Sequence, residues 1–99
     1  MKLEFHEQFA FDVSKDADYY DGVELGLGND FAREVWEAVQ WIKRNPSLSM
    51  TIYRDVRRVR LKRFKEHSVR YRFIEASNTI RILGVFHAKR HPTRGRARQ

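Results

Sequence analysis

The first residues of the chain alternate between apolar and polar side chains. In KLEFHEQF, Leu3 and Phe5 fall on one side of an extended chain, and charged or polar residues fall on the other. Alternation with a period of two is typical of a strand with one buried face. We therefore predict a first strand near residues 2 to 8.

Two helical segments follow, separated by a glycine-rich link. Ser14 is a typical helix N-cap, and acidic residues follow it in the first turn. This pattern predicts a short helix from Ser14 to about Tyr20. The stretch GVELGLGND then interrupts the pattern with three glycines. We expect Asn29 or Asp30 to cap the second helix.

The second helix has the clearest periodicity in the chain. Its apolar residues recur at a spacing of three to four, and the pattern stops at Pro46. Trp36 and Trp41 widen this stripe, and we expect both to pack in the core or between the helices. The stripe itself consists of Phe31, Val35, Val39 and Ile42. Two helices joined by a short link form an antiparallel hairpin that needs an apolar surface to cover.

The second half of the chain supplies that surface as three predicted strands. Residues 57 to 62 and 69 to 73 each alternate between an apolar side and a basic side, with a hairpin loop near FKEH between them. Residues 76 to 78, ASN, form a turn. The last strand, TIRILGVFH, is apolar on both faces over much of its length, which predicts a central place in the sheet.

This order of elements predicts an α+β fold. It consists of an N-terminal strand, an antiparallel helix hairpin and a three-stranded antiparallel meander, with the helices packed on one sheet face. A chain of 99 residues is long enough for one domain. We expect this domain to cover residues 1 to 92, followed by a basic, mobile tail at 93 to 99.

The composition limits the possible cellular location of the protein and the kinds of site that it can contain. The chain contains no cysteine, which excludes disulfides and thiolate metal sites and suits a reducing cytoplasm. The first residues lack the apolar run of a signal peptide, and no apolar stretch is long enough to span a membrane. We expect a cytoplasmic protein without a membrane partner.

The charges are divided unequally between the two halves. Residues 1 to 50 hold five Lys or Arg against ten Asp or Glu, a net charge of −5, and residues 51 to 99 hold fifteen against three, a net charge of +12. Such asymmetry indicates that the basic half binds a polyanion or an acidic protein.

The basic residues on the predicted strands would crowd one face of the sheet. Side chains two residues apart on a strand are separated by roughly 7 Å, so like charges there repel unless anions lie among them. Only Asp55, Glu66 and Glu75 lie nearby. We favour a binding surface over an ordinary solvated face. The residues that we predict to bind a target or nucleic acid are Arg58, Arg60, Lys62, Arg70, Arg72, Arg81, Lys89 and Arg90.

Cleavage of RNA without a metal is a further possibility for this surface. It requires a base for the 2′-hydroxyl proton, an acid for the leaving oxygen and cations around the phosphate. Tyr71 falls on the apolar side of its strand, and we predict that it is a core residue. If the chain is a nuclease, its catalytic candidates are Arg58, Arg60, Arg81, His87 and Arg90.

The histidines do not indicate a metal site. His87 and His91 have the spacing of half a site, but no Asp, Glu or Cys stands beside them. We expect no metal and no cofactor. His87 is interpreted as a polar residue that ends the last strand, and His6 and His67 as surface residues.

Five stretches of the sequence resemble the RelE/ParE superfamily, the toxins of bacterial type II toxin–antitoxin modules. They are LGLGNDFAREVWEAVQWIKRNP, Tyr53, VRRVRLKRF, VRYRF and IRILGVFHAKRHP, and they cover most of residues 20 to 92. Each stretch is short, but their order and spacing are specific. The superfamily has the same order of strand, helix hairpin and three-stranded meander that the patterns predict.

The resemblance is greater to the ParE branch than to the RelE branch. It rests on LGLG before the helix, Arg63 and Phe64 at the end of the second strand, and His-x-x-Arg-x-Pro after the last strand. It implies a growth inhibitor that acts on DNA gyrase, is not an enzyme and is neutralised by a cognate antitoxin. The chain departs from the ParE pattern at Lys65 and Glu66, where Pro-Tyr is common, and at Thr93, where an aromatic residue is usual.

The RelE branch implies a different function. Its toxins are ribosome-dependent endoribonucleases that cut messenger RNA, and on that interpretation Arg58 and Arg60 occupy the middle-strand positions and Arg90 a later one. Of the usual C-terminal Tyr or His, only His91 is present. A third alternative is a non-toxic, basic nucleic-acid-binding module. For either toxin, we expect the antitoxin to contribute an acidic segment that meets the basic sheet and an apolar groove beside the helices.

Overall fold

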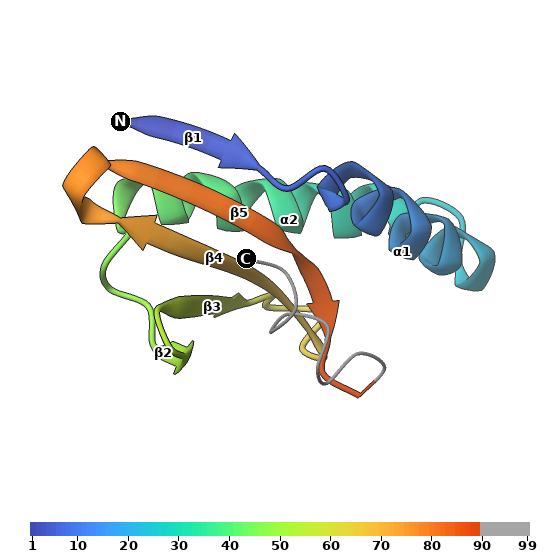
Figure 1. Cartoon of the computed structure of the whole chain (residues 1–99). Coiled ribbons are helices and arrows are strands. Elements are labelled where there is room, and N and C mark those ends of the chain that lie inside the picture. The colour runs from blue at the N-terminus through green and yellow to red at the C-terminus, as the bar shows by residue number, and fades with distance from the viewer. Residues whose placement is uncertain (90–99) are drawn as a thin grey trace.

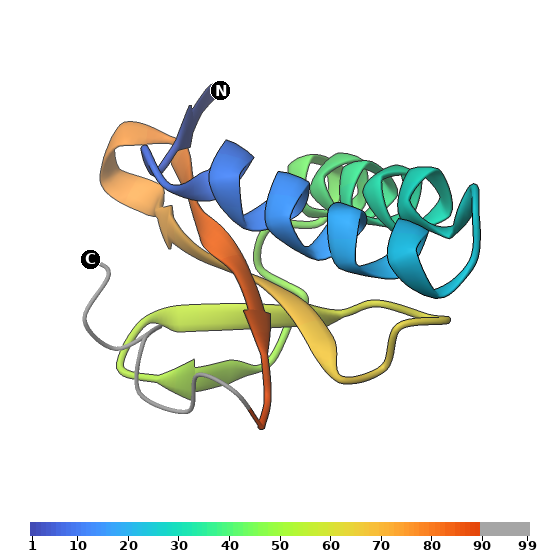
Figure 2. The same ribbon diagram turned by 90° about the vertical axis from the view of Figure 1, so that its right-hand side faces the viewer.

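A five-stranded mixed sheet with two helices on one face makes up the fold in the computed structural model, which describes residues 1 to 89. The strand order is β1-β5-β4-β3-β2, with β1 parallel to β5 and the other neighbours antiparallel. The helices lie side by side across the sheet (Figures 1 and 2). The elements are β1 (Lys2–Phe5), α1 (Phe9–Val23), α2 (Leu27–Arg44), β2 (Thr51–Tyr53), β3 (Val56–Arg60), β4 (His67–Ile74), a 3₁₀ turn (Glu75–Ser77) and β5 (Thr79–His87).

The α+β fold predicted from the sequence is confirmed, including the helix hairpin and the antiparallel β3, β4 and β5. Strand β5 spans the nine residues expected of it and lies inside the sheet, between β1 and β4. The tail predicted at 93 to 99 and the candidate Arg90 lie outside the described residues.

Three predicted boundaries are wrong. Strand β1 ends at Phe5, because the chain turns at His6, whose ring accepts a hydrogen bond from the Gln8 amide at 3.0 Å. Helix α1 begins at Phe9 and not at Ser14. Helix α2 begins at Leu27 after Gly26, whose φ of 92° suits glycine, so neither Asn29 nor Asp30 caps it.

Strand β2 was not predicted. It has only three residues, and its ladder with β3 is irregular, so it lacks the alternating run that identifies longer strands. It places a fifth strand at the edge of the sheet and leaves the end of β3 beyond Arg58 uncovered.

The main core lies between the helix hairpin and the sheet. Buried residues of α2, such as Phe31 and Val39, pack against β4 and β5 residues, such as Val69 and Ile80. Tyr71 is completely buried in this core, and its hydroxyl donates a hydrogen bond of 2.7 Å to the carbonyl of Pro46. The prediction that Tyr71 is a core residue is therefore confirmed.

A smaller apolar cluster lies on the opposite face of the sheet. Val56, Leu83 and Phe86 are buried there, with Ile52 of β2 against them. The β4–β5 register shifts beside Arg70, which lets β5 direct apolar residues to both faces. The alternation in residues 57 to 62 and 69 to 73 predicts a purely basic open face. The apolar cluster shows that this face is partly apolar.

Two predictions about individual side chains are also wrong. Trp36 and Trp41 are 55% and 36% exposed, because they flank the buried stripe of α2 rather than extend it. His67 is fully buried, and its Nε2 lies 2.8 Å from the Tyr20 hydroxyl. Among residues 1 to 89, no helix has the length and apolar composition that a membrane span requires.

Candidate protein-binding groove

A groove lies between α2 and β3. Its volume is about 550 Å³, which falls within the usual range of ligand sites. It opens where the short strand β2 leaves β3 uncovered. The side chains that line it are Glu34, Glu37, Ala38, Trp41, Arg44, Ser49, Arg58, Val59, Arg60, Leu61 and Lys62.

The floor of the groove is apolar and its two rims carry opposite charges. Ala38 and Leu61 are buried, whereas Val59 and Trp41 remain partly exposed to the groove. The α2 rim carries two glutamates and, at the end of the helix, Arg44, and the β3 rim carries only basic charges. A ligand with apolar and acidic groups would match both the floor and the β3 rim.

The basic rim brings together three of the cations predicted from the sequence. Arg58, Arg60 and Lys62 all line the groove. Within residues 1 to 89, neither the Arg58 nor the Arg60 guanidinium group has a hydrogen-bond or ion-pair partner. These two side chains can therefore bind an external anion without first losing an internal partner.

Glu34 defines one end of the groove. One of its carboxylate oxygens accepts hydrogen bonds from the backbone amides of Lys62 and Arg63, at 3.0 and 3.1 Å. These bonds connect α2 to the chain directly after β3. The Glu34 carboxylate thus stabilises one wall of the groove, whereas Glu37 on the same rim is exposed.

The other predicted cations are engaged within the fold. Arg72 donates hydrogen bonds of 2.8 to 3.2 Å to Asp55, and this guanidinium lowers the pKa of the Asp55 carboxyl below its usual value of 3.8. The Arg70 guanidinium is buried and lies 4.9 Å from the centre of the Phe86 ring. Arg81 lies 3.8 Å from Glu4, and Lys89 lies 4.0 Å from Glu66.

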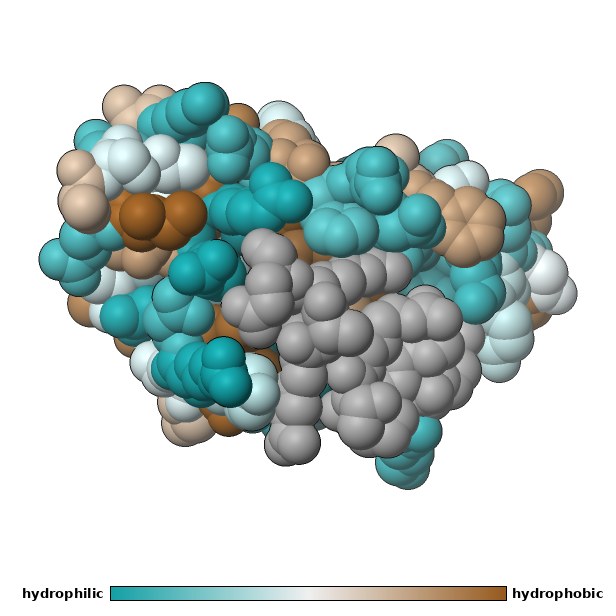
Figure 3. Space-filling view, in the orientation of Figure 1, coloured by the Kyte–Doolittle hydropathy of each residue, from teal (hydrophilic) through white to brown (hydrophobic). Residues whose placement is uncertain are grey.

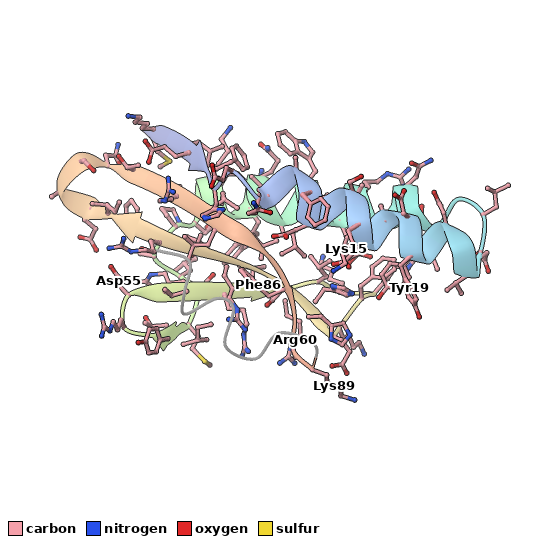
Figure 4. The ribbon with its side chains drawn as sticks, turned by 45° about the vertical axis from the view of Figure 1, so that its right-hand side comes forward. Lys15, Tyr19, Asp55, Arg60, Phe86 and Lys89 are labelled. Atoms are coloured by element: carbon pink, nitrogen blue, oxygen red, sulfur yellow. The ribbon has the colours of Figure 1, made fainter. Side chains whose placement is uncertain are left out.

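The sheet register separates the candidates that a nuclease would have to bring together. Arg58 faces Arg70 across the β3–β4 ladder, whereas Arg60 faces Ser68 and Arg81 faces Arg72, four residues apart on β4. Arg60 ends β3, far from the turn that carries Asp55 (Figure 4). Arg60 and Arg81 are therefore not neighbours on this face.

His87 lies where the sequence placed it, at the end of β5. Its Nδ1 accepts a hydrogen bond of 3.1 Å from the Lys89 amide, and its ring packs edge-on against His67 at 5.0 Å between centres. In the described part of the chain, no three His, Asp or Glu side chains are arranged to hold a metal ion.

A buried polar cluster connects α1 to the ends of β4 and β5, and sequence reasoning missed it. His67 Nδ1 lies 3.5 Å from the Asp16 carboxylate, and Asp12 accepts a hydrogen bond of 3.3 Å from the Val85 amide. Asp12, Asp16 and Tyr20 recur every four residues, which places them along one side of α1. This spacing in the sequence could have predicted that α1 directs a row of polar side chains toward the sheet.

The surface is otherwise predominantly hydrophilic in the view of Figure 3, with small hydrophobic patches between polar side chains. Large exposed apolar residues in other places include Phe11, Tyr19 and Leu48. They do not line the α2–β3 groove.

Comparison with solved structures identifies the fold. The chain is similar to a chain of the chromosomal ParDE TA system from P. aeruginosa, with a TM-score of 0.74 and 19% identity over 88% of this chain and 95% of that one. It is also similar to a chain of the intact E. coli RelBE toxin–antitoxin complex (TM-score 0.65, 14% identity, 90% and 98% covered) and to the isolated E. coli RelE toxin (0.62, 15%, 97% and 93%). No protein-family model and no curated protein sequence matches the chain. The fold is thus that of the RelE/ParE toxins, as the sequence resemblance indicated.

Proposed function

We propose that the chain is the toxin of a type II toxin–antitoxin module, that it inhibits growth in the bacterial cytoplasm by acting on DNA gyrase, and that a cognate antitoxin neutralises it. The observation that carries this proposal is the α2–β3 groove, whose Arg58 and Arg60 have no partner in the described chain, on a fold similar to toxin–antitoxin structures. The antitoxin covers the groove and its cations, which the target would otherwise contact.

The arrangement of acid–base groups favours gyrase inhibition over RNA cleavage. A ribonuclease needs a base and an acid beside its phosphate-binding cations. Tyr71 is buried and donates to Pro46, and His67 is buried against Tyr20. Neither group is available beside Arg58 and Arg60, and the His87 ring packs against His67 on the helix side of the sheet.

One observation supports ribosome-dependent cleavage of messenger RNA as the second candidate function. Arg58 and Arg70 lie directly opposite each other on the open face of the sheet. Arg58 has no described partner and suits a phosphate group, and the positive charge of the buried Arg70 adds to the attraction. On this alternative the groove would still receive the antitoxin.

Two parallel assays distinguish these functions. Purified protein is added to a DNA gyrase supercoiling reaction and, separately, to in vitro translation followed by primer extension on the message. Our proposal predicts loss of supercoiling with intact message. Cuts in the message with normal supercoiling would assign the function to the endoribonuclease. Normal results in both assays would leave the non-toxic binding module.

A matched pair of variants controls these assays. Arg58→Ala combined with Arg60→Ala removes the free cations of the groove, and Arg33→Ala removes an exposed cation of α2 outside it. We expect the double variant to lose gyrase inhibition and the single variant to retain it.

A further inference from the structure

Strand β1 forms one edge of the sheet, and only one of its sides is paired. It lies next to β5 (Figures 1 and 2), and no described strand lies on its other side. The Lys2 and His6 amides donate bonds of 3.0 and 2.8 Å to carbonyl groups in β5 and the turn before it. Because neighbouring residues of a strand direct their backbone groups to alternate sides, the N–H and C=O groups of Leu3 and Phe5 point outward.

This edge is regular, in contrast to the edge at the other side of the sheet. Strand β1 pairs with β5 over four consecutive residues without a shift in register. Strand β2, at the opposite edge, has an irregular ladder, and the Arg57 guanidinium donates hydrogen bonds to two carbonyls of the loop before it. Irregularity is one way in which proteins prevent an exposed edge from pairing with another chain. Strand β1 has no such irregularity, so its outer side can accept a further strand.

The charges of β1 favour another copy of β1 as that further strand. Glu4 lies beside Arg81, with 3.8 Å between their charged groups, and Lys2 lies on the same face of the sheet as Glu4. Leu3 packs against the main core on the helix face. In an antiparallel pair of copies related by a twofold axis at Leu3, Lys2 of each copy would lie directly opposite Glu4 of the other. Opposite charges in that position stabilise a pair of strands.

The backbone groups fit the same arrangement. With the twofold axis at Leu3, the two Leu3 residues exchange both of their N–H···O=C bonds, as an antiparallel ladder requires. An axis at Lys2 or at Glu4 would also match outward-facing backbone groups, but it would place two lysines or two glutamates directly opposite each other. Like charges in that position are destabilising. The charges therefore select the register centred on Leu3.

Exposed apolar side chains lie on the helix side of this edge. Met1 is 62% exposed and Phe5 is 40% exposed, and the Phe5 ring packs against Phe9 at 4.9 Å between centres. In the register centred on Leu3, Met1 of each copy would lie opposite Phe5 of the other. Contacts between a thioether and an aromatic ring are favourable. This contact would remove from water apolar surface that a single chain leaves exposed.

The position of β1 also limits the repulsion between two copies. Each chain has a net charge of +7, which opposes self-association. Strand β1 belongs to the first 50 residues, whose net charge is −5, and β5 and β4 separate it from the basic strand β3. Two copies joined at β1 would therefore keep their basic β3 strands apart and leave both α2–β3 grooves open.

We infer that β1 is a self-association edge: two copies of this chain pair through their β1 strands, antiparallel and centred on Leu3. The twofold axis is perpendicular to the sheet, so the dimer has one continuous sheet with both helix hairpins on the same face. It presents two α2–β3 grooves, one in each half. Self-association at β1 does not require that the chain inhibits gyrase.

Charge reversal at β1 tests this pairing. Sedimentation velocity of the untagged full chain measures association from about 1 μM to about 1 mM, the range that suits a small interface. Lys2→Glu and Glu4→Lys each place like charges opposite each other and should weaken the dimer at least about tenfold. Glu7→Lys makes the same change of charge in the exposed turn after β1 and should leave association unchanged.

A mixture of the two single variants tests the register. A Lys2→Glu chain paired with a Glu4→Lys chain has opposite charges at both positions, and so does the chain with both substitutions paired with itself. We expect both combinations to associate about as tightly as wild type. Weakening by the single variants without this recovery would overturn the register centred on Leu3.

Amide hydrogen exchange by NMR locates the contact in the wild-type chain. The Leu3 amide should exchange more slowly as the protein concentration rises through the range of dimerisation. The His6 amide, which is bonded to Ile82 within one chain, should be protected at every concentration. A monomer throughout the range, a dimer that neither single variant weakens, or exchange at Leu3 that does not depend on concentration would each overturn the inference.

Discussion

The arginines of β3 and β4 have different surroundings. On β4, Arg72 forms a close ion pair with Asp55 and Arg70 is buried against Phe86. On β3, Arg58 and Arg60 line a groove without a described partner. The sequence shows similar alternation of arginine in both places, so density of charge does not identify a binding site. The difference lies in what the fold supplies to each cation.

The largest effect should come from the apolar cluster beneath the engaged cations. Phe86→Ala should lower the free energy of unfolding by about 3–5 kcal/mol, because a completely buried ring leaves a cavity and Arg70 loses its contact. Chemical denaturation measures this loss. Trp41→Ala in the groove is the control and should cost about 1 kcal/mol or less. Equal losses would remove the distinction between the two regions.

The next effect concerns Tyr71, which connects the core to the end of α2. Tyr71→Phe should cost about 1 kcal/mol, because the Pro46 carbonyl loses its hydrogen bond. Burial raises the pKa of Tyr71 above its usual value of 10.0. The stability that the neutral Tyr71 hydroxyl contributes is therefore fully present below pH 10 and is lost as the pH rises through the folded-state pKa.

Unfolding measured from pH 8 to 11 tests this prediction. Wild type should lose more stability than Tyr71→Phe over that range. Identical pH profiles would show that the Tyr71 hydroxyl does not ionise differently in the folded and unfolded states.

A smaller effect is expected at the engaged ion pair. Asp55→Asn should lower the free energy of unfolding by about 0.2–1 kcal/mol at pH 7, since the pair is largely exposed and screened. The pKa of Asp55 is lowered by Arg72, so the contribution is present above pH 3.8 and is lost as the pH falls through the folded-state value. Denaturation at pH 7 and pH 2 should show a larger difference from wild type at pH 7 than at pH 2.

The smallest effect on stability should come from the groove cations. Arg58→Glu with Arg60→Glu should change the free energy of unfolding by no more than about 0.5 kcal/mol, because neither guanidinium has a described partner to lose. A loss near that of Phe86→Ala would contradict the view that these arginines are available for a ligand.

The sequence predicted the elements whose patterns are long and regular. Strand β5 and the amphipathic face of α2 follow from unbroken apolar spacing. The predicted start of helix α1 is wrong because Asp12 and Asp16 interrupt the apolar pattern of its inner face. Burial of these two carboxylates depends on their contacts with Val85 and His67. Those contacts join residues far apart in the chain.

The candidate site could be predicted only in part for the same reason. Alternation placed Arg58, Arg60 and Lys62 together correctly. Their availability depends on the short length of β2 and on the bonds from Glu34, which no local pattern reveals. The exposure of Trp41 likewise follows from the position of α2 relative to β3.

A supercoiling titration with three proteins of comparable stability tests the central claim most directly. Wild type and Arg72→Ala should inhibit DNA gyrase, whereas Arg58→Ala combined with Arg60→Ala should not, although it remains folded. Inhibition by the double variant at the wild-type concentration would contradict the assignment of function to the free cations of the groove.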